Sequence, residues 1–196
     1  MHERLSASAR ALARLAEDRA VRAALEALAT RLAQTLSAGG KVLVCGNGGS
    51  AADAQHLATE LVVRLRASCE RRALAAIALT TDTSLLTACA NDYGFERVFA
   101  RQVEALGRPG DVLVGISTSG SSANVVAAFV QARRQGLATV LFSGATGGTL
   151  RELADHAVLV PERDTAHIQE GHLACYHALC YALEQRLFGA GGEGRP

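Results

Sequence analysis

The first 37 residues place their apolar side chains at intervals of three and four, which is the period of an α-helix. The leucines that carry this spacing are Leu5, Leu12, Leu15, Leu25, Leu28, Leu32 and Leu36. A charged break at Glu17–Arg19 divides the pattern into two amphipathic helices. Both precede the first strand, so we expect these N-terminal helices, residues 1–37, to bury their apolar stripes in a subunit interface.

Beyond Gly40 the pattern changes to short runs of apolar and β-branched residues. Five strands are predicted, at Lys41–Cys45, Ala75–Leu79, Asp111–Ile116, Ala138–Phe142 and Ala157–Val160. Helices are predicted to alternate with them at about 50–66, 83–106, 121–135, 148–154 and 165–188. This alternation is typical of an α/β fold with a five-stranded parallel sheet, doubly wound as in flavodoxin. Folds of this kind bind their ligands at the carboxyl ends of the strands. We expect the active site after the first and third strands, and a disordered tail at 189–196.

Composition narrows the class of protein. The chain is 49% hydrophobic and 20% charged, as in soluble globular proteins, and no apolar run approaches the roughly 20 residues of a membrane span. No secretory signal is visible, so we expect a cytoplasmic protein. Lys and Arg total 20 against 19 Asp and Glu, and the net charge of +1 provides no basic face for nucleic acid. The five cysteines lack CxxC spacing and are expected to be small buried side chains.

A glycine-rich turn, Gly46–Ser50, follows the first strand and opens a helix. Backbone N–H groups at such a helix start can hold an anion. Residues Gly46–Ala51 also match the GxGxxA pattern of dinucleotide sites, but that pattern needs an acidic residue about 20 positions later, at the end of the second strand. Here the second strand ends far later, at Thr80–Asp82, and no Walker Lys is present. A small phosphorylated ligand is the better match, and a turn without a ligand is the alternative.

A second turn of this kind, Ile116–Ser122, follows the third strand and carries four serines and one threonine. Hydroxyl-rich helix starts also serve only as caps. Two turns that can bind anions at one edge of a sheet nevertheless favour a phosphate site. Neither turn contains Lys or Arg, so neutral donors would hold one phosphate monoester.

Two helices carry polar residues at ligand spacing. His56 and Glu60 stand four apart and project from one helix face, which suits metal ligands or an exposed hydrogen-bonded pair. Nearby Asp53 is explained as an acidic residue in the first turn of that helix. Spacing alone does not separate ligands from core residues among three side chains of the last helix, namely Gln169, His172 and His177.

In three stretches the sequence resembles the phosphoheptose isomerases of the sugar isomerase (SIS) superfamily: CGNGGSAADAQHLATEL, ALTTDTSLLTACANDYGFERVFARQVEALGRPGDVLVGISTSGSSANV and DTAHIQEGHLACYH. The resemblance runs from the N-terminal helices to about Phe188. It implies a single SIS domain over residues 1–188, a homotetramer with sites at subunit interfaces, and one zinc ion per subunit. The implied reaction converts sedoheptulose 7-phosphate to D-glycero-D-manno-heptose 7-phosphate, the first step toward nucleotide-activated heptose and lipopolysaccharide.

The resemblance also implies a role for individual residues. The implied metal ligands are His56, Glu60, Gln169 and His177. Glu60 is the implied base and His177 the implied acid of an enediol mechanism. The implied substrate contacts are Ser117, Thr118, Ser119 and Ser122 for the phosphate, with Asn47, Gly48, Ser50, Asp92 and Gln169 around the sugar phosphate. Two residues depart from the family, Ser121 where many members have Asn or Lys, and His167 where many have Arg or Lys.

A binding protein is the principal alternative. A relative in the same superfamily associates with the replication initiator, but it lacks an acidic residue matching Glu60 and has Asn in place of His177. This chain has both residues, which favours catalysis. A regulatory domain that senses sugar phosphates is a third interpretation, disfavoured because no DNA-binding segment is attached.

Overall fold

The fold is given by a computed structural model that describes residues 1–189. Five parallel strands form one sheet in the order β2-β1-β3-β4-β5. The strands are β1 (Val42–Gly46), β2 (Ala76–Ala78), β3 (Val112–Ile116), β4 (Ala138–Gly144) and β5 (His156–Val160). This is the doubly wound order of flavodoxin-like sheets. The predicted fold class and strands are confirmed, with ends shifted by at most two residues.

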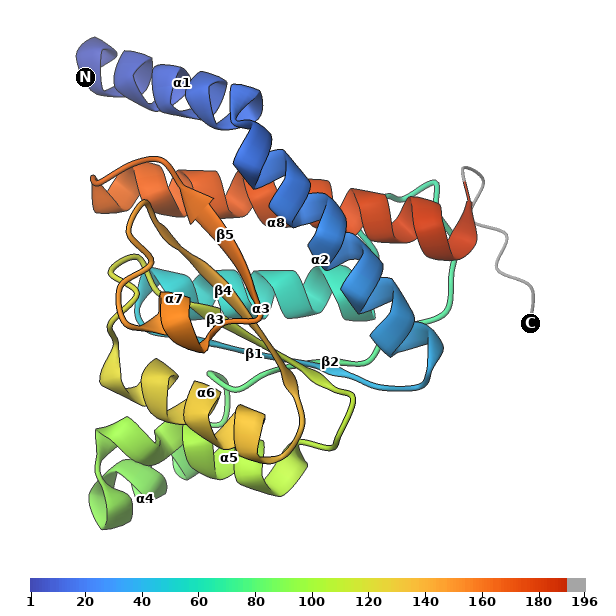
Figure 1. The fold of residues 1–196 in the computed structure, drawn as a ribbon, viewed down its shortest axis with the longest axis vertical. Helices are drawn as coiled ribbons and strands as arrows, with labels where there is room; N and C mark the ends of the chain where they lie inside the picture. Colours follow the sequence, from blue (N-terminus) through green and yellow to red (C-terminus); the bar gives the residue numbers. More distant parts are fainter. Residues whose placement is uncertain (190–196) are drawn as a thin grey trace.

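Helices cover both faces of the sheet (Figure 1). One face carries α2 (Arg19–Ser37), α3 (Gly49–Val62) and α8 (Thr165–Phe188), with α1 (His2–Glu17) packed on α8. The other carries α4 (Thr83–Tyr93), α5 (Val98–Leu106), α6 (Ala123–Arg134) and α7 (Leu150–Leu153). Successive residues of β1 enter different cores, Val42 and Val44 toward α2, α3 and α8, and Leu43 and Cys45 toward the opposite layer. Because both faces are buried, the strands read as continuous apolar runs.

The predicted helix over residues 83–106 is wrong as a single element. It is divided into α4, a short 3-10 helix η1 (Phe95–Arg97) and α5. Gly94 ends α4 with φ +87°, a conformation that L side chains rarely adopt and glycine adopts freely. The bend places Asp92 and Tyr93 at the end of α4, where they line an apolar cavity of about 360 Å³ together with residues of α5.

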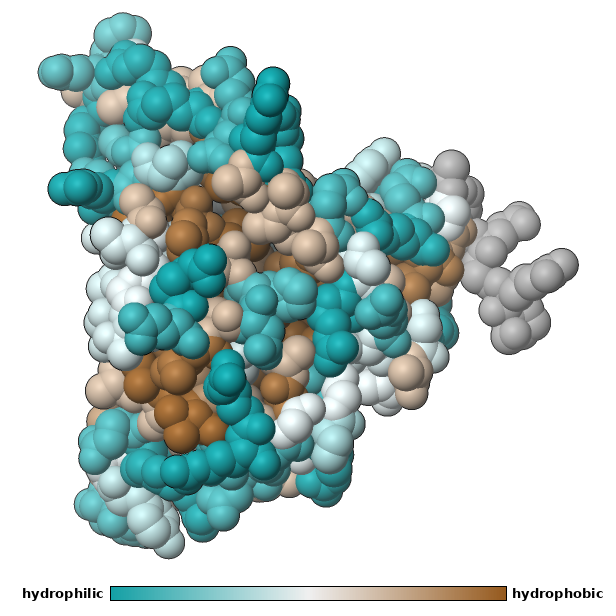
Figure 2. Space-filling view, in the orientation of Figure 1, coloured by the Kyte–Doolittle hydropathy of each residue, from teal (hydrophilic) through white to brown (hydrophobic). Residues whose placement is uncertain are grey.

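The apolar stripe of the N-terminal helices is partly buried within the chain itself. Leu28 and Leu32 of α2 are fully buried in the core that also contains α8. On α1, by contrast, Leu5 is 67% exposed and Leu12 37% exposed. Apolar surface gathers beneath α1 in Figure 2, where residues of α1, α2 and α8 line a groove of about 300 Å³. The predicted subunit interface concerns this exposed remainder, and it stays a prediction.

Three further predictions concern membranes, cysteines and the tail. Among residues 1–189, no helix combines the length and the apolarity that crossing a membrane requires. All five cysteines are free and buried, as expected, and burial raises the pKa of the Cys45, Cys175 and Cys180 thiols to about 12. The predicted tail at 189–196 lies outside the described residues apart from Gly189.

Candidate functional site

The two polar turns identified in the sequence lie side by side. β1 and β3 are neighbours, with Gly46 opposite Ile116, so the turns that follow them meet at one edge of the sheet. From β1 the chain passes to α3 on one face, and from β3 it passes to α6 on the other. A crevice forms where successive connections diverge in this way. Asn47 and Asn124 join the turns through reciprocal amide hydrogen bonds of 2.8 Å.

Three serine hydroxyls of the second turn converge. Ser117 Oγ lies 3.0 Å from Ser122 Oγ and 3.5 Å from Ser119 Oγ. The backbone of Ser117 is held in place because its carbonyl accepts a 2.7 Å hydrogen bond from the buried Ser143 hydroxyl. Ser122 is the N-cap residue of α6, so the hydroxyls gather at a helix start, where the helix dipole favours an anion. We call Ser117, Ser119 and Ser122 the serine cradle.

The other predicted substrate residues divide by position. Asn47, Gly48 and Ser50 belong to the first turn and the start of α3, beside the cradle. Thr118 accepts from the Gly144 N–H and lines a cavity of about 270 Å³ shared with residues after β4 and β5. Asp92 lies on α4, on the opposite face of the sheet from α3, and its carboxylate accepts from Asn91. A single chain therefore does not bring Asp92 to α3 and α8.

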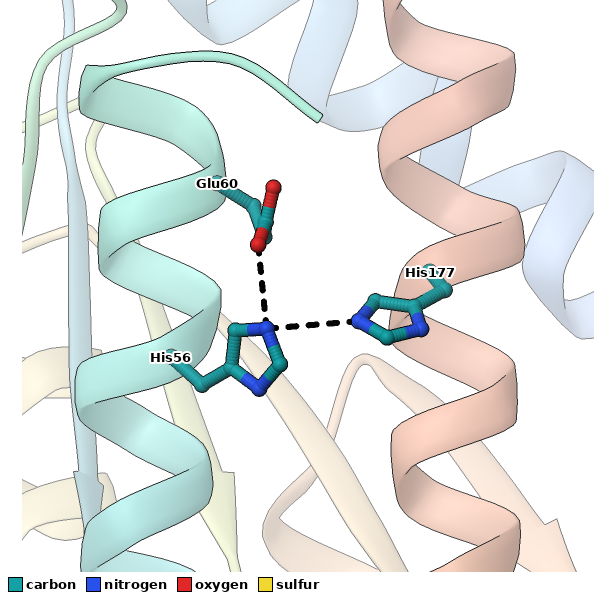
Figure 3. Close-up of side chains that lie close together, drawn as sticks. All are labelled: His56, Glu60 and His177. Atoms are coloured by element: carbon teal, nitrogen blue, oxygen red, sulfur yellow. Dashed lines mark hydrogen bonds and ion pairs between the residues drawn. The ribbon is translucent and has the colours of Figure 1, made fainter. Parts of the chain in front are cut away.

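A cluster of three predicted ligands forms between α3 and α8 (Figure 3). His56 Nε2 lies 3.0 Å from Glu60 Oε1 and 3.3 Å from His177 Nε2. One donor atom from each of the three residues lies within 4.8 Å of the others. The helix spacing of His56 and Glu60 supplies two members, and packing of α8 against α3 supplies the third. We call these residues the HEH cluster.

The donor set of the HEH cluster fits zinc. Imidazole nitrogen and carboxylate oxygen are both zinc ligands, and three protein ligands with an open fourth position are typical of catalytic zinc sites. Ligand atoms at about 2.0–2.2 Å from one tetrahedral ion stand roughly 3.3–3.6 Å apart. The gaps of 3.0 and 3.3 Å around His56 Nε2 are close to that separation. The His56 side chain is 41% exposed, which leaves access for a substrate.

The structure separates the three polar residues of α8 that spacing left open. His177 joins the HEH cluster. His172 is a core residue with no exposed surface, its ring standing edge-on to Phe142. Gln169 lies against Gly49 at the start of α3, where an added Cβ would come 2.4 Å from Gln169 Nε2. Gln169 is eight positions before His177, roughly 12 Å along the helix, so its amide lies toward the turns.

Two residues beside the cluster were missed or misinterpreted in the sequence. The Tyr176 hydroxyl lies 3.1 Å from His56 Nδ1 and 3.3 Å from Asp53 Oδ1. Asp53 therefore does not act as a first-turn acid of α3, because it stands beyond the first turn and faces α8. Burial raises the pKa of Asp53, opposed by the Tyr176 hydrogen bond and by His56. The available signal was the three-residue spacing of Asp53 and His56, which places both on one helix face.

A buried ion cluster fixes the end of α3. Arg71 donates to the carbonyl oxygens of Glu60, at 2.7 Å, and Leu61, at 3.0 Å. Its guanidinium also pairs with Glu184 of α8, which accepts from Arg66 as well. Burial raises the pKa of Glu184, but the hydrogen bonds from Arg66, the Leu65 N–H and Arg71 outweigh burial and bring it below its ordinary value. The helix end that carries Glu60 is thus tied to the helix that carries His177.

Comparison with known proteins identifies the family of this chain. A family model described as SIS domain matches residues 5–144. A phosphoheptose isomerase from Roseiflexus sp. (strain RS-1) is 60% identical over 162 residues, which cover 83% of this chain and 81% of the relative. The structure of a phosphoheptose isomerase from Neisseria gonorrhoeae is 44% identical with a TM-score of 0.86, covering 94% of this chain and 98% of that one. A structure from Francisella tularensis is 37% identical with a TM-score of 0.88, covering 94% and 96%. The chain belongs to the SIS domain family and, within it, to the phosphoheptose isomerases.

Proposed function

We propose that the chain converts sedoheptulose 7-phosphate to D-glycero-D-manno-heptose 7-phosphate. The observation that carries this proposal is the pairing of an anion site near the start of α3 with acid–base residues farther along α3 and on the adjoining α8. Ser50, in the first turn of α3, lies beside the serine cradle, and His56 follows six residues later, roughly 9 Å along the helix axis. A linear sugar with a phosphate at one end and a carbonyl at the other suits two such sites.

At the phosphate end, neutral groups bind the substrate. The hydroxyls of Ser117, Ser119 and Ser122 and the N–H groups at the start of α6 donate to the phosphate oxygens. Asn47, Gly48 and Ser50 contact the sugar phosphate from the first turn, with Thr118, Asp92 and Gln169 as further predicted contacts. These interactions are the same in the ground state and in the transition state, so they serve binding more than rate.

At the carbonyl end, Glu60 and His177 move protons. Glu60 removes the proton from C1 of the ketose, and the C1–H electron pair forms the C1–C2 double bond while His177 gives a proton to the C2 oxygen. The resulting enediol collapses when His177 takes the proton from the C1 oxygen and Glu60 returns its proton to C2. The product has its carbonyl at C1, and both residues end in their starting protonation states.

A zinc ion is part of this proposal, one per subunit, held by His56, Glu60 and His177. The predicted fourth ligand, Gln169, lies toward the turns within one chain and would have to come from a neighbouring subunit. Such an ion would polarise the sugar carbonyl and stabilise negative charge on the enediol oxygen. The proposal also includes a cytoplasmic homotetramer with sites at subunit interfaces, which would let a neighbouring chain contribute residues such as Asp92. The product would be the first intermediate toward nucleotide-activated heptose.

The test is an isomerase assay with sedoheptulose 7-phosphate, in which NMR identifies the product. The protein is assayed as isolated, after chelation, and after zinc is restored. Glu60→Gln is expected to abolish turnover while sugar phosphate binding persists, because it removes the base and an anionic zinc ligand but leaves the serine cradle intact. Glu70→Gln is the matched control, since Glu70 is 87% exposed and lies outside the cluster.

Each outcome of that assay changes a different part of the proposal. Conversion that chelation suppresses and zinc restores supports the isomerase and the metal site together. Conversion that survives full removal of metal keeps the isomerase and removes zinc from it. Absence of conversion by the zinc-loaded protein overturns the isomerase and favours a sugar phosphate binding protein.

A further inference from the structure

A buried tyrosine connects the HEH cluster to a carboxylate behind it. Tyr176 has no exposed surface and lies on α8, directly before His177. Its hydroxyl reaches across to α3, where it lies 3.1 Å from His56 Nδ1 and 3.3 Å from Asp53 Oδ1. The opposite ring nitrogen of His56, Nε2, faces Glu60 and His177. The hydroxyl therefore contacts the side of His56 that faces away from the cluster.

The number of protons on Asp53, Tyr176 and His56 determines which of these side chains donates each hydrogen bond. An ionised carboxylate only accepts hydrogen bonds, and a phenol has one proton to give. The Tyr176 hydroxyl donates that proton to Asp53, so toward His56 its oxygen can only accept. A neutral His56 then carries its proton on Nδ1 and donates it to Tyr176. Nε2 is left with a lone pair that faces Glu60 Oε1 at 3.0 Å and His177 Nε2 at 3.3 Å. Because the ionised Glu60 also only accepts, this arrangement is completed by a cation between the two acceptors.

We propose that Asp53 and Tyr176 are positioning residues that hold His56 in the tautomer with its proton on Nδ1, so that Nε2 can bind a cation. The inference rests on the metal site proposed above. Partners of this kind behind a ligating histidine fix the tautomer and the ring orientation. Here the partner is a tyrosine relayed to a carboxylate, and both bonds lie in the interface between α3 and α8.

The position of Asp53 supports a role beyond stability. Its Oδ2 atom is buried without a hydrogen-bond partner among the described residues. A buried polar atom without a partner lowers the free energy of unfolding. Among the described residues, only Tyr176 donates a hydrogen bond to the Asp53 carboxylate. The carboxylate orients the Tyr176 hydroxyl so that its proton points toward Asp53, which an apolar side chain at this position would not do.

Two variants separate the roles of the two residues. Tyr176→Phe keeps the ring and removes the hydroxyl, so His56 Nδ1 loses its partner and the ring proton should move toward Nε2, where Glu60 accepts it. Asp53→Ala frees the Tyr176 proton for donation to His56 Nδ1, so the ring proton should move to Nε2, where it is donated to Glu60. Zinc affinity, measured by competition with a chelator, should fall about 10- to 100-fold in both variants.

The tautomer is read directly in the metal-free protein by nitrogen-15 NMR of the histidine ring at mildly alkaline pH, with His56→Gln to assign the signals. We expect wild type to carry the proton on Nδ1, and Asp53→Ala to carry it on Nε2. Tyr181→Phe is the control, because this hydroxyl lies on the same helix, is exposed, and accepts from Gln185. It should change neither the tautomer nor zinc affinity.

The results distinguish this inference from the proposed function. A wild-type His56 with its proton on Nε2 overturns the inference, and so does Asp53→Ala with an unchanged tautomer and unchanged zinc affinity. Failure of the wild-type protein to bind zinc overturns the proposed metal site. The NMR result for the metal-free protein still decides whether Asp53 and Tyr176 set the tautomer.

Discussion

Acid should destabilise this protein through one buried histidine, His172. Its side chain has no exposed surface, and neither ring nitrogen has a hydrogen-bond partner among the described residues. The ring stands edge-on to Phe142, with centroids 6.0 Å apart. Burial lowers the pKa of His172 from 6.5 to about 4, against a smaller opposing effect of the Ser143 backbone. The folded protein therefore holds this imidazole neutral at pH values where the unfolded chain protonates it.

The sign and size of the effect follow from proton linkage. Above about pH 6.5 neither state binds the proton, so His172 does not make the free energy of unfolding depend on pH. Between 6.5 and about 4 the unfolded chain binds one more proton, and stability falls with pH. Each pKa unit corresponds to about 1.4 kcal/mol, so the full loss is about 3 kcal/mol by pH 4. That is a large part of the stability of an ordinary domain.

The test replaces His172 by Leu, which removes the titrating group and two unpaired polar atoms at similar volume. Urea unfolding is followed at a series of pH values for wild type, His172→Leu and the exposed control His2→Gln. The free energy of unfolding of His172→Leu, relative to that of wild type, should rise by about 3 kcal/mol as pH falls from 6.5 to 4. That of the exposed control His2→Gln should change with pH as wild type does. A difference between His172→Leu and wild type that does not change with pH would refute the reasoning.

The remaining predictions concern the cradle, the ion cluster and the start of α3. Ser119→Ala should raise KM for the sugar phosphate about 10- to 100-fold and leave kcat nearly unchanged, because it removes one hydrogen bond to a charged group; a fall in kcat alone would contradict the cradle. Glu184→Gln should lower the free energy of unfolding by about 3–5 kcal/mol in urea, because it leaves the buried cation of Arg71 without its carboxylate. Gly49→Ala should displace the Gln169 amide and raise KM in steady-state kinetics, since the added Cβ would come 2.4 Å from that side chain; unchanged KM would exclude Gln169 from substrate binding.

The sheet was predictable because its strands are buried on both faces. Continuous apolar runs such as Val42–Cys45 and Val112–Ile116 are typical of strands in a parallel sheet that helices cover on both faces. The break at Gly94 was not predictable from periodicity. A single glycine within an apolar helical pattern is tolerated in many helices, and the positive φ that ends α4 follows from how α5 packs on the sheet and on α6.

The candidate site was predictable only where its residues are close in sequence. His56 and Glu60 share a helix face, and the serines of the cradle share one turn, so local spacing places them. The position of His177 depends on how α8 crosses α3, which no local pattern contains. For the same reason spacing left Gln169, His172 and His177 equivalent, although the structure puts one at the turns, one in the core and one in the cluster.

Tyr176 shows why a pattern of apolar and polar positions misses some functional residues altogether. Such a pattern assigns each residue either to the core or to the surface, and Tyr176 fits the core because its ring is fully buried. Its hydroxyl nevertheless needs a hydrogen-bond partner there, and a buried partner must come from another element. That requirement brings Asp53 and His56 to it across the interface between α3 and α8. In such a residue the ring is buried in the core while the hydroxyl forms hydrogen bonds. A search for residues that orient a site should therefore include amphipathic side chains one position from a candidate ligand.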